Sequence, residues 1–434
     1  MDPEGPGKPE RHDRSRPELY WWRNRPAAGE ERLPGRGGKA PADAAFEPGK
    51  RLGRKPSAKE SDGPPNQPLV GNAGAAFRCA STFGILNYIN IFRELTEVNT
   101  GSRKFRFDGR LSRFLVCLLL CLMIVASAAA EEEFQPFFRF DLNKVNAWQE
   151  PLSNVRFLTS GAWTLNPIDP QKCEEYGIDP NALPSTEGLD TLNISGSAEF
   201  SEDQFLQLAD DIRSFAQDRQ VWIVDCRLES HALINGIAIS WYGDHNWANK
   251  GMTLAEAEAD EQSRFGALPG TTITVYTASN NTPGNPQEIT VERWMSEREL
   301  VEREGFHYLR LAGNDHSWPE EDAVDGFISF VRELDQEVGL DNVWLHFHCH
   351  AGKSRTGIFM AIYDMIRNPG ISFEDVMLRQ AMTGSSYLPN VDEQSEIADV
   401  YVLRAQRIRQ VYDYLHSEEG DGMGISWIEW LSQN

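Results

Sequence analysis

The feature that most constrains the fold of this chain is a cysteine separated by five residues from an arginine. The residues between Cys349 and Arg355 are His350-Ala351-Gly352-Lys353-Ser354. An apolar run at 343–347 precedes the segment, and a second apolar run follows at 358–362. This pattern predicts a buried strand, a tight loop and then a helix. Backbone N–H groups and the helix dipole at such a junction suit an anion such as phosphate.

The residue types in this loop indicate covalent chemistry. The field at a helix N-terminus favours the thiolate form of a cysteine, which makes Cys349 a candidate nucleophile. Arg355 can hold two phosphate oxygens at once, and Thr356 is placed to hydrogen-bond the sulfur. A lone Cys349 would suggest an ordinary buried thiol. Together with Arg355, Thr356 and Gly352, it indicates a cysteine-dependent phosphatase.

Four segments extend the pattern and together resemble the bacterial protein-tyrosine-phosphatase-like (PTP-like) phytases, enzymes that hydrolyse myo-inositol polyphosphates. The resemblance covers roughly residues 135–415. The segments are Asn154-Val155-Arg156, 224–231 with 240–249, Asn314-Asp315-His316-Ser317-Trp318-Pro319, and 344–349 with the loop. Two residues depart from the family pattern: Cys226 replaces a usually apolar residue, and Ser354 replaces a common glycine.

The resemblance implies an α/β fold, a PTP-like core with a small accessory partial β-barrel, and no metal or other cofactor. It implies that Asp315 is the general acid; a helix cap is the alternative. The implied substrate-binding residues are His350, Ala351, Gly352, Lys353, Ser354, His316, Arg156, Asp225 and Arg227. For Arg227 an internal salt-bridge network is an equal alternative, and Lys353 could simply face solvent.

Net charge restricts the class of partner. The sequence holds 42 Lys and Arg and 65 Asp and Glu, of which 21 and 14 fall in residues 1–130, so the remainder carries a net charge of −30. An acidic body argues against a nucleic-acid partner. Selectivity for a polyphosphorylated small molecule must then come from basic groups inside the cleft.

The N-terminal region divides by composition. Residues 1 to about 75 are rich in Pro, Gly, Arg and Glu and lack apolar periodicity. Residues 1–110 are predicted to be disordered, or to be a misassigned extension. Residues 111–130 combine an apolar stretch with a small-residue Ala-x-Ala end, which predicts a signal peptide, no stable membrane insertion after cleavage, and a secreted or periplasmic protein. A genuine extension with an anchor helix is the alternative. Residues 131–434 are the expected PTP-like phytase domain, with a small β-rich subdomain near 265–300.

Periodicity within this domain predicts several elements. We expect a buried strand at 220–225, a helix at 253–264 capped by Thr253, and a strand pair around the turn cluster 280–286. Further helices are expected at 320–337, 372–382 and 396–414. Three cysteines remain after the expected signal cleavage. A disulfide between Cys173 and Cys226 is one alternative, although buried free thiols are the commoner outcome.

Three histidines at every second position, His346, His348 and His350, raise the question of a metal site. Side chains two residues apart on a strand are about 6.6 Å apart, which suits a tetrahedral metal poorly. We therefore expect His346 and His348 to be buried groups that shape the loop. The sequence predicts a phosphatase for inositol polyphosphates; a protein-tyrosine phosphatase and a non-catalytic inositol-phosphate-binding module remain the alternatives.

Overall fold

The computed structural model describes residues 134–143, 146–279, 281–418 and 424–434. The predicted disordered segment and the predicted signal peptide lie outside these residues. Among the described residues, no helix combines the length and apolar character needed to cross a bilayer.

A five-stranded sheet forms the centre of the fold, in the order β10-β4-β11-β3-β2. The strands are β2 Arg156–Leu158, β3 Ile194–Ala198, β4 Gln220–Asp225, β10 His307–Arg310 and β11 Val343–Cys349. All neighbours are parallel except β2 and β3, which are antiparallel. Every residue of β11 is buried because the strand is central and both faces of the sheet are covered by helices.

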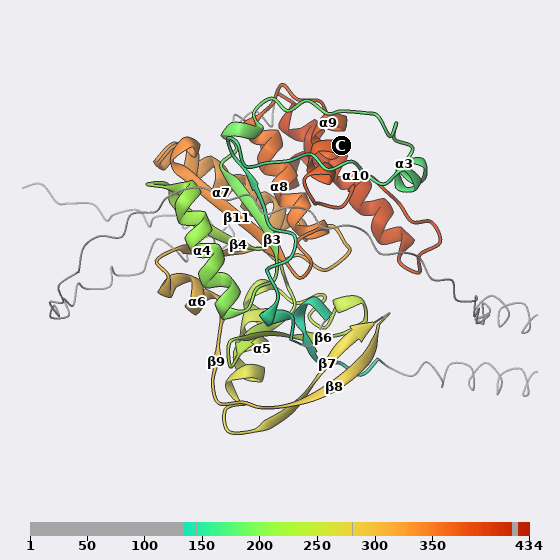
Figure 1. Ribbon diagram of the computed structural model, residues 1–434. Helices are drawn as coiled ribbons and strands as arrows, with labels where there is room; N and C mark the ends of the chain where they lie inside the picture. The colour runs from blue at the N-terminus through green and yellow to red at the C-terminus, as the bar shows by residue number, and fades with distance from the viewer. Residues whose placement is uncertain (1–133, 144–145, 280, 419–423) are drawn as a thin grey trace, which may run out of the picture. The chain divides into compact units, whose positions relative to one another are not determined.

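Helices cover the two faces unequally (Figure 1). Leu345 and Phe347 of β11 belong to a core shared with the larger helical layer, whereas Trp344 points into the core on the opposite face. The larger layer is α7 Glu321–Glu337, α8 Ser354–Arg367, α9 Phe373–Met382, α10 Ala398–Leu415 and α11 Trp427–Gln433. The smaller layer is α4 Glu202–Ala216 and α6 Glu297–Arg303. Successive side chains of β11 point to opposite faces of the sheet, so the strand contributes to one hydrophobic core on each face.

A second sheet has six strands in the order β8-β7-β1-β6-β5-β9. They are β1 Phe137–Phe140, β5 His231–Ile234, β6 Ile237–Tyr242, β7 Thr272–Ser279, β8 Thr282–Thr290 and β9 Trp294–Met295. Helix α5, Leu254–Gly266, packs Phe265 into the core of this sheet. The β-rich part thus extends well beyond 265–300, because β1, β5 and β6 supply half of its strands.

Most predicted elements are present, and the helix cap predicted at Thr253 is formed. Strand β4 matches its predicted bounds, and α5 begins after a Thr253 capping box. The β7–β8 pair is antiparallel as predicted, but β8 starts at Thr282 and therefore contains most of the expected turn cluster. Pro283 and Pro286 are tolerated there because β8 is an edge strand. The remaining short elements are α3 Pro170–Tyr176, η2 Asp141–Asn143, η3 Ala147–Gln149, η4 Leu189–Thr191, η5 Asp244–Asn246 and η6 Leu340–Asn342.

Candidate active site

The cysteine–arginine segment forms the predicted strand–loop–helix junction. Cys349 ends β11, Ser354 opens α8, and both Cys349 and Arg355 are buried. Gly352 has φ +65°, and a Cβ atom there would lie 2.3 Å from the carbonyl oxygen of Ser197. The loop can therefore close only with glycine at this position. Ser354, where glycine is commoner in the family, adopts helical geometry and needs no glycine.

The carbonyl groups of the loop are held by Arg156, the first residue of β2, and by Asn154, two residues before it. Asn154 Nδ2 donates to the carbonyl oxygens of Gly352 at 2.8 Å and Ala351 at 3.3 Å. Arg156 NH1 donates to the same Gly352 oxygen at 2.9 Å. Arg156 NH2 also lies 3.2 Å from Ser385 Oγ. Arg156 was expected to bind substrate, but it is buried and its guanidinium supports the loop from outside.

His350 does not add a positive charge to the loop. Its Nε2 accepts a hydrogen bond from the backbone N–H of Leu142 at 3.1 Å, and its carbonyl accepts one from the Glu199 N–H at 3.3 Å. Burial and the positive charge of Arg139 lower the pKa of His350 to about 3. His350 is therefore a neutral imidazole hydrogen-bonded to η2, and it is not the additional positive charge that the sequence suggested. Lys353, in contrast, is exposed.

Arg355 is fully buried and paired with two carboxylates. NH1 contacts Glu229 Oε2 at 2.5 Å and donates to the Gly313 carbonyl at 3.2 Å, and NH2 lies 3.2 Å from Asp315 Oδ2. Burial alone would lower the pKa of Arg355, but the negative charges of Asp315, Glu229 and Cys349 raise it above its ordinary value. Its Nε has no hydrogen-bond partner among the described residues, so a donor remains for an anion.

Asp315 lies at Arg355 and does not cap a helix. The N-cap of α7 is Glu320, which excludes the capping alternative for Asp315. Asn246 Nδ2 donates to Asp315 Oδ2 at 3.1 Å, and Trp247 Nε1 donates to its carbonyl at 2.8 Å. Burial would raise the pKa of Asp315, but the positive charge of Arg355, helped by His316, outweighs burial and lowers this pKa to about 2. The carboxylate is thus ionised while Arg355 is its partner.

His316 and Ser354 are linked through one arginine of α10. His316 has φ +65°, and its Nδ1 lies 3.4 Å from Tyr401 Oη. Arg404 NH1 lies 3.4 Å from the His316 carbonyl and 3.3 Å from Ser354 Oγ. Burial lowers the pKa of His316 below its ordinary value, and Asp315 offsets this only in part. The lowered pKa favours the neutral form of His316.

Arg227 belongs to an internal salt-bridge network, the second of the two alternatives. It is fully buried, and its guanidinium contacts Glu229 Oε1 at 2.9 Å, Glu199 Oε2 at 2.5 Å and Asp141 Oδ2 at 3.2 Å. Three carboxylates around one arginine leave no face for substrate. Arg227 instead orients Glu229, which in turn holds Arg355.

Asp225 is likewise internal. It is fully buried, accepts a 2.8 Å hydrogen bond from Tyr308 Oη and lies 3.3 Å from both Arg310 and His231. Although burial would raise the pKa of Asp225, His231 and Arg310 lower it well below its ordinary value. These contacts anchor the end of β4, and the expected contact of Asp225 with substrate stays a prediction.

The histidines of β11 are buried, as expected. His346 hydrogen-bonds Ser195 Oγ at 2.8 Å and Ser197 Oγ at 3.1 Å. Its ring lies 6.1 Å from that of His348. Burial and the charge of His348 lower the pKa of His346 well below its ordinary value. His346, His348 and His350 contact separate partners rather than one common point.

His348 is part of a buried chain of alternating charges, which we call the carboxylate–histidine chain: Asp225, His231, Glu297, His348 and Glu199. Glu297 lies 2.8 Å from His348 Nε2 and 3.3 Å from His231 Nε2. Glu199 lies 3.3 Å from His348 Nδ1. These groups are near enough to suggest a metal site. However, Glu199 and Glu297 contact opposite nitrogens of His348, so this imidazole cannot bind one ion together with both carboxylates. At His231, Asp225 and Glu297 both lie 3.3 Å from Nε2.

The hydroxyl of Thr356 and the cysteines complete the site. Thr356 Oγ1 is buried and has no hydrogen-bond partner among the described residues, so its expected bond to sulfur is not formed here. Cys173, Cys226 and Cys349 are all free and buried, and no Cys173–Cys226 disulfide is present.

Two residues at the site had no role assigned from the sequence. Glu229 holds Arg355, and the amide nitrogen of Asn246 joins Glu229 Oε1, at 2.9 Å, to Asp315. Both lie within the segments that carry the family resemblance. The available signal was the arginine itself, because a buried guanidinium requires a carboxylate partner.

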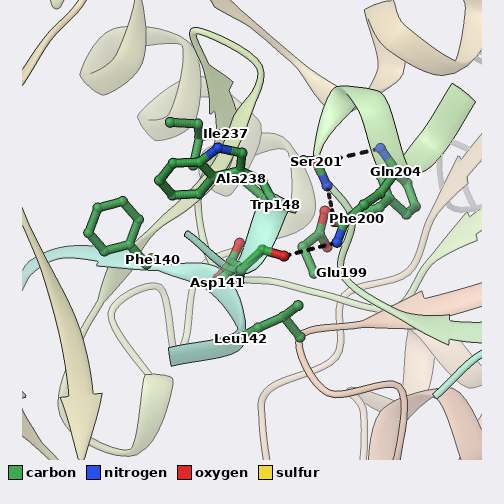
Figure 2. A pocket seen from close by; sticks show the side chains of 11 residues that line it. Phe140, Asp141, Leu142, Trp148, Glu199, Phe200, Ser201, Gln204, Ile237 and Ala238 are labelled. Atoms are coloured by element: carbon green, nitrogen blue, oxygen red, sulfur yellow. Dashed lines mark hydrogen bonds between the residues drawn. The ribbon is translucent and has the colours of Figure 1, made fainter. Parts of the chain in front are cut away.

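A small hollow lies beside η2, and Asp141 and Leu142 of that element are part of its wall (Figure 2). Figure 2 shows that Phe140, Trp148, Ile237 and other apolar side chains form much of its wall. The wall also includes Asp141 and Glu199, whose carboxylates are both paired with Arg227. The hollow therefore presents no free catalytic group, and the chemistry is better placed at the loop.

Taken together, the parallel sheet and the strand–loop–helix junction with cysteine and arginine at its two ends define a PTP-like protein. Residues 224–367 match the family model of the PTP-like phytases, whose description reads inositol hexakisphosphate. The chain is also similar to a tandemly repeated PTP-like phytase from Mitsuokella multacida, with 34% identity, 68% of this chain and 49% of that chain covered, and a TM-score of 0.60. The resemblance to bacterial PTP-like phytases is confirmed.

Two further proteins are similar to this chain at lower sequence identity. A PTP-like phytase from Bdellovibrio bacteriovorus is 27% identical, with 69% of this chain and 96% of that chain covered and a TM-score of 0.50. The effector protein hopD2 of Pseudomonas syringae pv. tomato is 28% identical over 57% of this chain and 53% of its own length. The chain spans about half the length of hopD2 and of the M. multacida phytase.

Proposed function

We propose that this protein is a cysteine-dependent phosphomonoester hydrolase that acts on myo-inositol polyphosphates. Cys349 attacks phosphorus in line and forms a phosphocysteine, while the leaving alkoxide departs opposite it. The observation that carries the proposal is the buried Arg355. Among the residues that the structure describes, its Nε has no hydrogen-bond partner and its NH2 is paired with Asp315 at 3.2 Å. That donor set matches the equatorial oxygens of a transferring phosphoryl group.

Asp315 is the proposed general acid, and its protonation follows from exchange of partners at Arg355. In the free protein Arg355 lowers the pKa of Asp315 to about 2. A phosphate dianion that takes over Arg355 removes this counter-ion and adds a nearby negative charge, and both changes raise the pKa of a carboxyl group. Asp315 can then protonate the leaving inositol oxygen and later deprotonate the water that releases phosphate.

The loop stabilises the charge that develops on phosphorus. Asn154 and Arg156 hold the Gly352 carbonyl outward, which favours N–H groups turned toward the bound anion. The peptide N–H groups from His350 to Arg355 are the proposed oxyanion donors, and Thr356, next to Arg355, is the proposed donor to sulfur when Cys349 leaves. This chemistry requires no metal ion.

The substrate class rests on the relatives. One solved structure, 33% identical with 70% of this chain and 50% of that chain covered and a TM-score of 0.60, is a PTP-like myo-inositol phosphatase from M. multacida in complex with myo-inositol-(1,3,4,5)-tetrakisphosphate. In this chain the exposed Lys353 and the neutral His316 are the proposed contacts for phosphates that do not react. His350, neutral and anchored to η2, is not needed for that role.

The test compares inositol hexakisphosphate with a phosphotyrosine peptide and p-nitrophenyl phosphate, using the full chain and a Cys349→Ser control. Release of phosphate from inositol hexakisphosphate with the highest kcat/KM supports the proposal. Preference for the phosphotyrosine peptide would instead indicate a protein-tyrosine phosphatase. Binding of inositol hexakisphosphate without phosphate release would indicate a non-catalytic binding module.

We also propose that the protein is exported, on the basis of the 111–130 segment. N-terminal sequencing of the protein made from its native gene should give a start between Ala129 and Glu131. A mature chain that retains residues upstream of 111 would refute both cleavage and the misassigned start.

A further inference from the structure

Cys226 is a buried thiol for which the proposed phosphatase mechanism has no use. It follows the last residue of β4, as Cys349 ends β11, and β4 and β11 are parallel neighbours. The last pair in their register is Asp225 with His348, and the N–H of Cys226 donates to the His348 carbonyl at 3.0 Å. The ladder thus continues one residue further and sets Cys226 opposite Cys349.

The two thiols also share one face of the sheet. Val224 and Phe347 are paired and both face the larger helical layer, and paired residues two positions further on face the same way. Cys226 and Cys349 accordingly lie in the same buried core. Adjacent strands are about 4.8 Å apart, which falls within the Cα separation of about 4.4–6.8 Å that a disulfide spans.

The electrostatics assign different roles to the two sulfurs. Burial, then the negative charge of Cys349, raise the pKa of the Cys226 thiol well above its ordinary value. Cys226 therefore stays protonated and reacts poorly with oxidants by itself. Its sulfur has only a weak contact, 3.7 Å to the Val224 carbonyl oxygen. Cys349, beside Arg355 at the loop, is the thiol that an oxidant attacks first.

We propose that Cys226 and Cys349 form a site of reversible covalent modification, in which Cys226 closes a disulfide onto Cys349 after a peroxide has oxidised it. This rests on the proposed function only in taking Cys349 as the reactive thiol. The disulfide would make the protein inactive, because Cys349 could no longer act as the nucleophile. It would also protect the Cys349 sulfur from irreversible oxidation.

The reaction has two balanced steps and a reversal. The Cys349 thiolate attacks one oxygen of hydrogen peroxide; the S–O bond forms, the O–O bond breaks, hydroxide leaves, and sulfur loses two electrons to become a sulfenic acid. The Cys226 sulfur then attacks the sulfenic sulfur; the S–S bond forms, the S–O bond breaks, and the thiol proton leaves with hydroxide as water. A dithiol supplies two electrons and restores both thiols.

The experiment exposes the full chain to hydrogen peroxide and compares it with Cys226→Val and with Cys173→Ser, a buried cysteine on α3. Peptide mass spectrometry without reductant should find a Cys226–Cys349 linked peptide in the unmodified sequence and in Cys173→Ser. Dithiothreitol should restore most of their lost activity. In Cys226→Val, Cys349 should gain two or three oxygens, and about tenfold less activity should return.

Two results would overturn the proposal: no linked peptide at a peroxide dose that inactivates the protein, or equal recovery in Cys226→Val. If Cys226→Val folds poorly, the linked peptide in the unmodified sequence still decides. The peptide readout needs no substrate. A chain that forms the link but hydrolyses no phosphate would therefore refute the proposed function and leave the dithiol standing.

Discussion

Arg156 and Lys353 are both expected from the sequence to grip phosphates that do not react, and the structure assigns them different tasks. Arg156 is buried, and its NH1 holds the Gly352 carbonyl at 2.9 Å. Lys353 is exposed on the same loop. Removal of Arg156 should therefore disturb the phosphate cradle for every substrate, whereas removal of Lys353 should affect only substrates that carry a second phosphate.

The size of the Arg156 effect follows from the lost contact. A hydrogen bond made by a charged group contributes about 1.5–3 kcal/mol, which corresponds to a fall in kcat/KM of about 10- to 150-fold for Arg156→Ala. The fall should be similar for inositol hexakisphosphate and p-nitrophenyl phosphate. An exposed charge pair is worth much less, so Lys353→Ala should raise KM for inositol hexakisphosphate by about two- to fivefold and leave p-nitrophenyl phosphate unchanged.

Steady-state kinetics on both substrates at fixed ionic strength provide the assay. Lys172→Ala, which removes an exposed lysine from α3, is the matched control for Lys353→Ala. Arg156→Lys should recover part of the loss, because an ammonium can still donate to the Gly352 carbonyl. The reasoning is refuted if Arg156→Ala raises KM for inositol hexakisphosphate alone, since that pattern belongs to a residue that touches the second phosphate.

Four other outcomes follow from the site. Cys349→Ser should abolish turnover and preserve ligand binding, because it removes the nucleophile and keeps the loop; activity above a few per cent would exclude this role. Asp315→Asn should lower kcat on inositol hexakisphosphate about 10²–10⁴-fold and remove the alkaline fall in the pH profile, with a smaller loss on p-nitrophenyl phosphate; equal losses would contradict proton donation to the leaving group. Vanadate should inhibit and chelators should not; zinc rescue of a chelated enzyme would revive a metal site. Burial and Arg227 lower the pKa of His231, but Asp225 helps to raise it to about 10 overall. The positive charge of His231 therefore contributes its full stabilisation below pH 6.5, and this contribution is lost as pH rises toward 10. The free energy of unfolding, measured with urea, should decline over that range in the unmodified protein and should decline less in His231→Gln.

The sequence allowed the central elements to be predicted because their signals are local. The apolar run before Cys349 matches β11, and Ser354 and Thr356 fall in α8 as expected. Capping by Thr253 and the helical spacing around Phe327 likewise depend only on neighbours in the chain. Positions of this kind are predictable without knowledge of tertiary contacts.

The contacts of single charged residues were not predictable, because each depends on partners far away in the sequence. Arg227 meets Asp141, 86 residues earlier, and Arg355 meets Glu229, 126 residues earlier. A buried arginine looks the same in a sequence whether it binds substrate or a carboxylate of its own fold. The neutral state of His350 could not be predicted for the same reason, because it depends on the contact with Leu142 and on burial.

The carboxylate–histidine chain limits how this protein can be divided. His231 belongs to β5 of the six-stranded sheet, His348 to β11 of the central sheet, and Glu297 at the start of α6 contacts both. A fragment that omits α6 would leave His348, next to Cys349, without Glu297, and a fragment that omits β5 would leave Glu297 without His231. Deletion or grafting should therefore keep residues 231–297 with the PTP-like core.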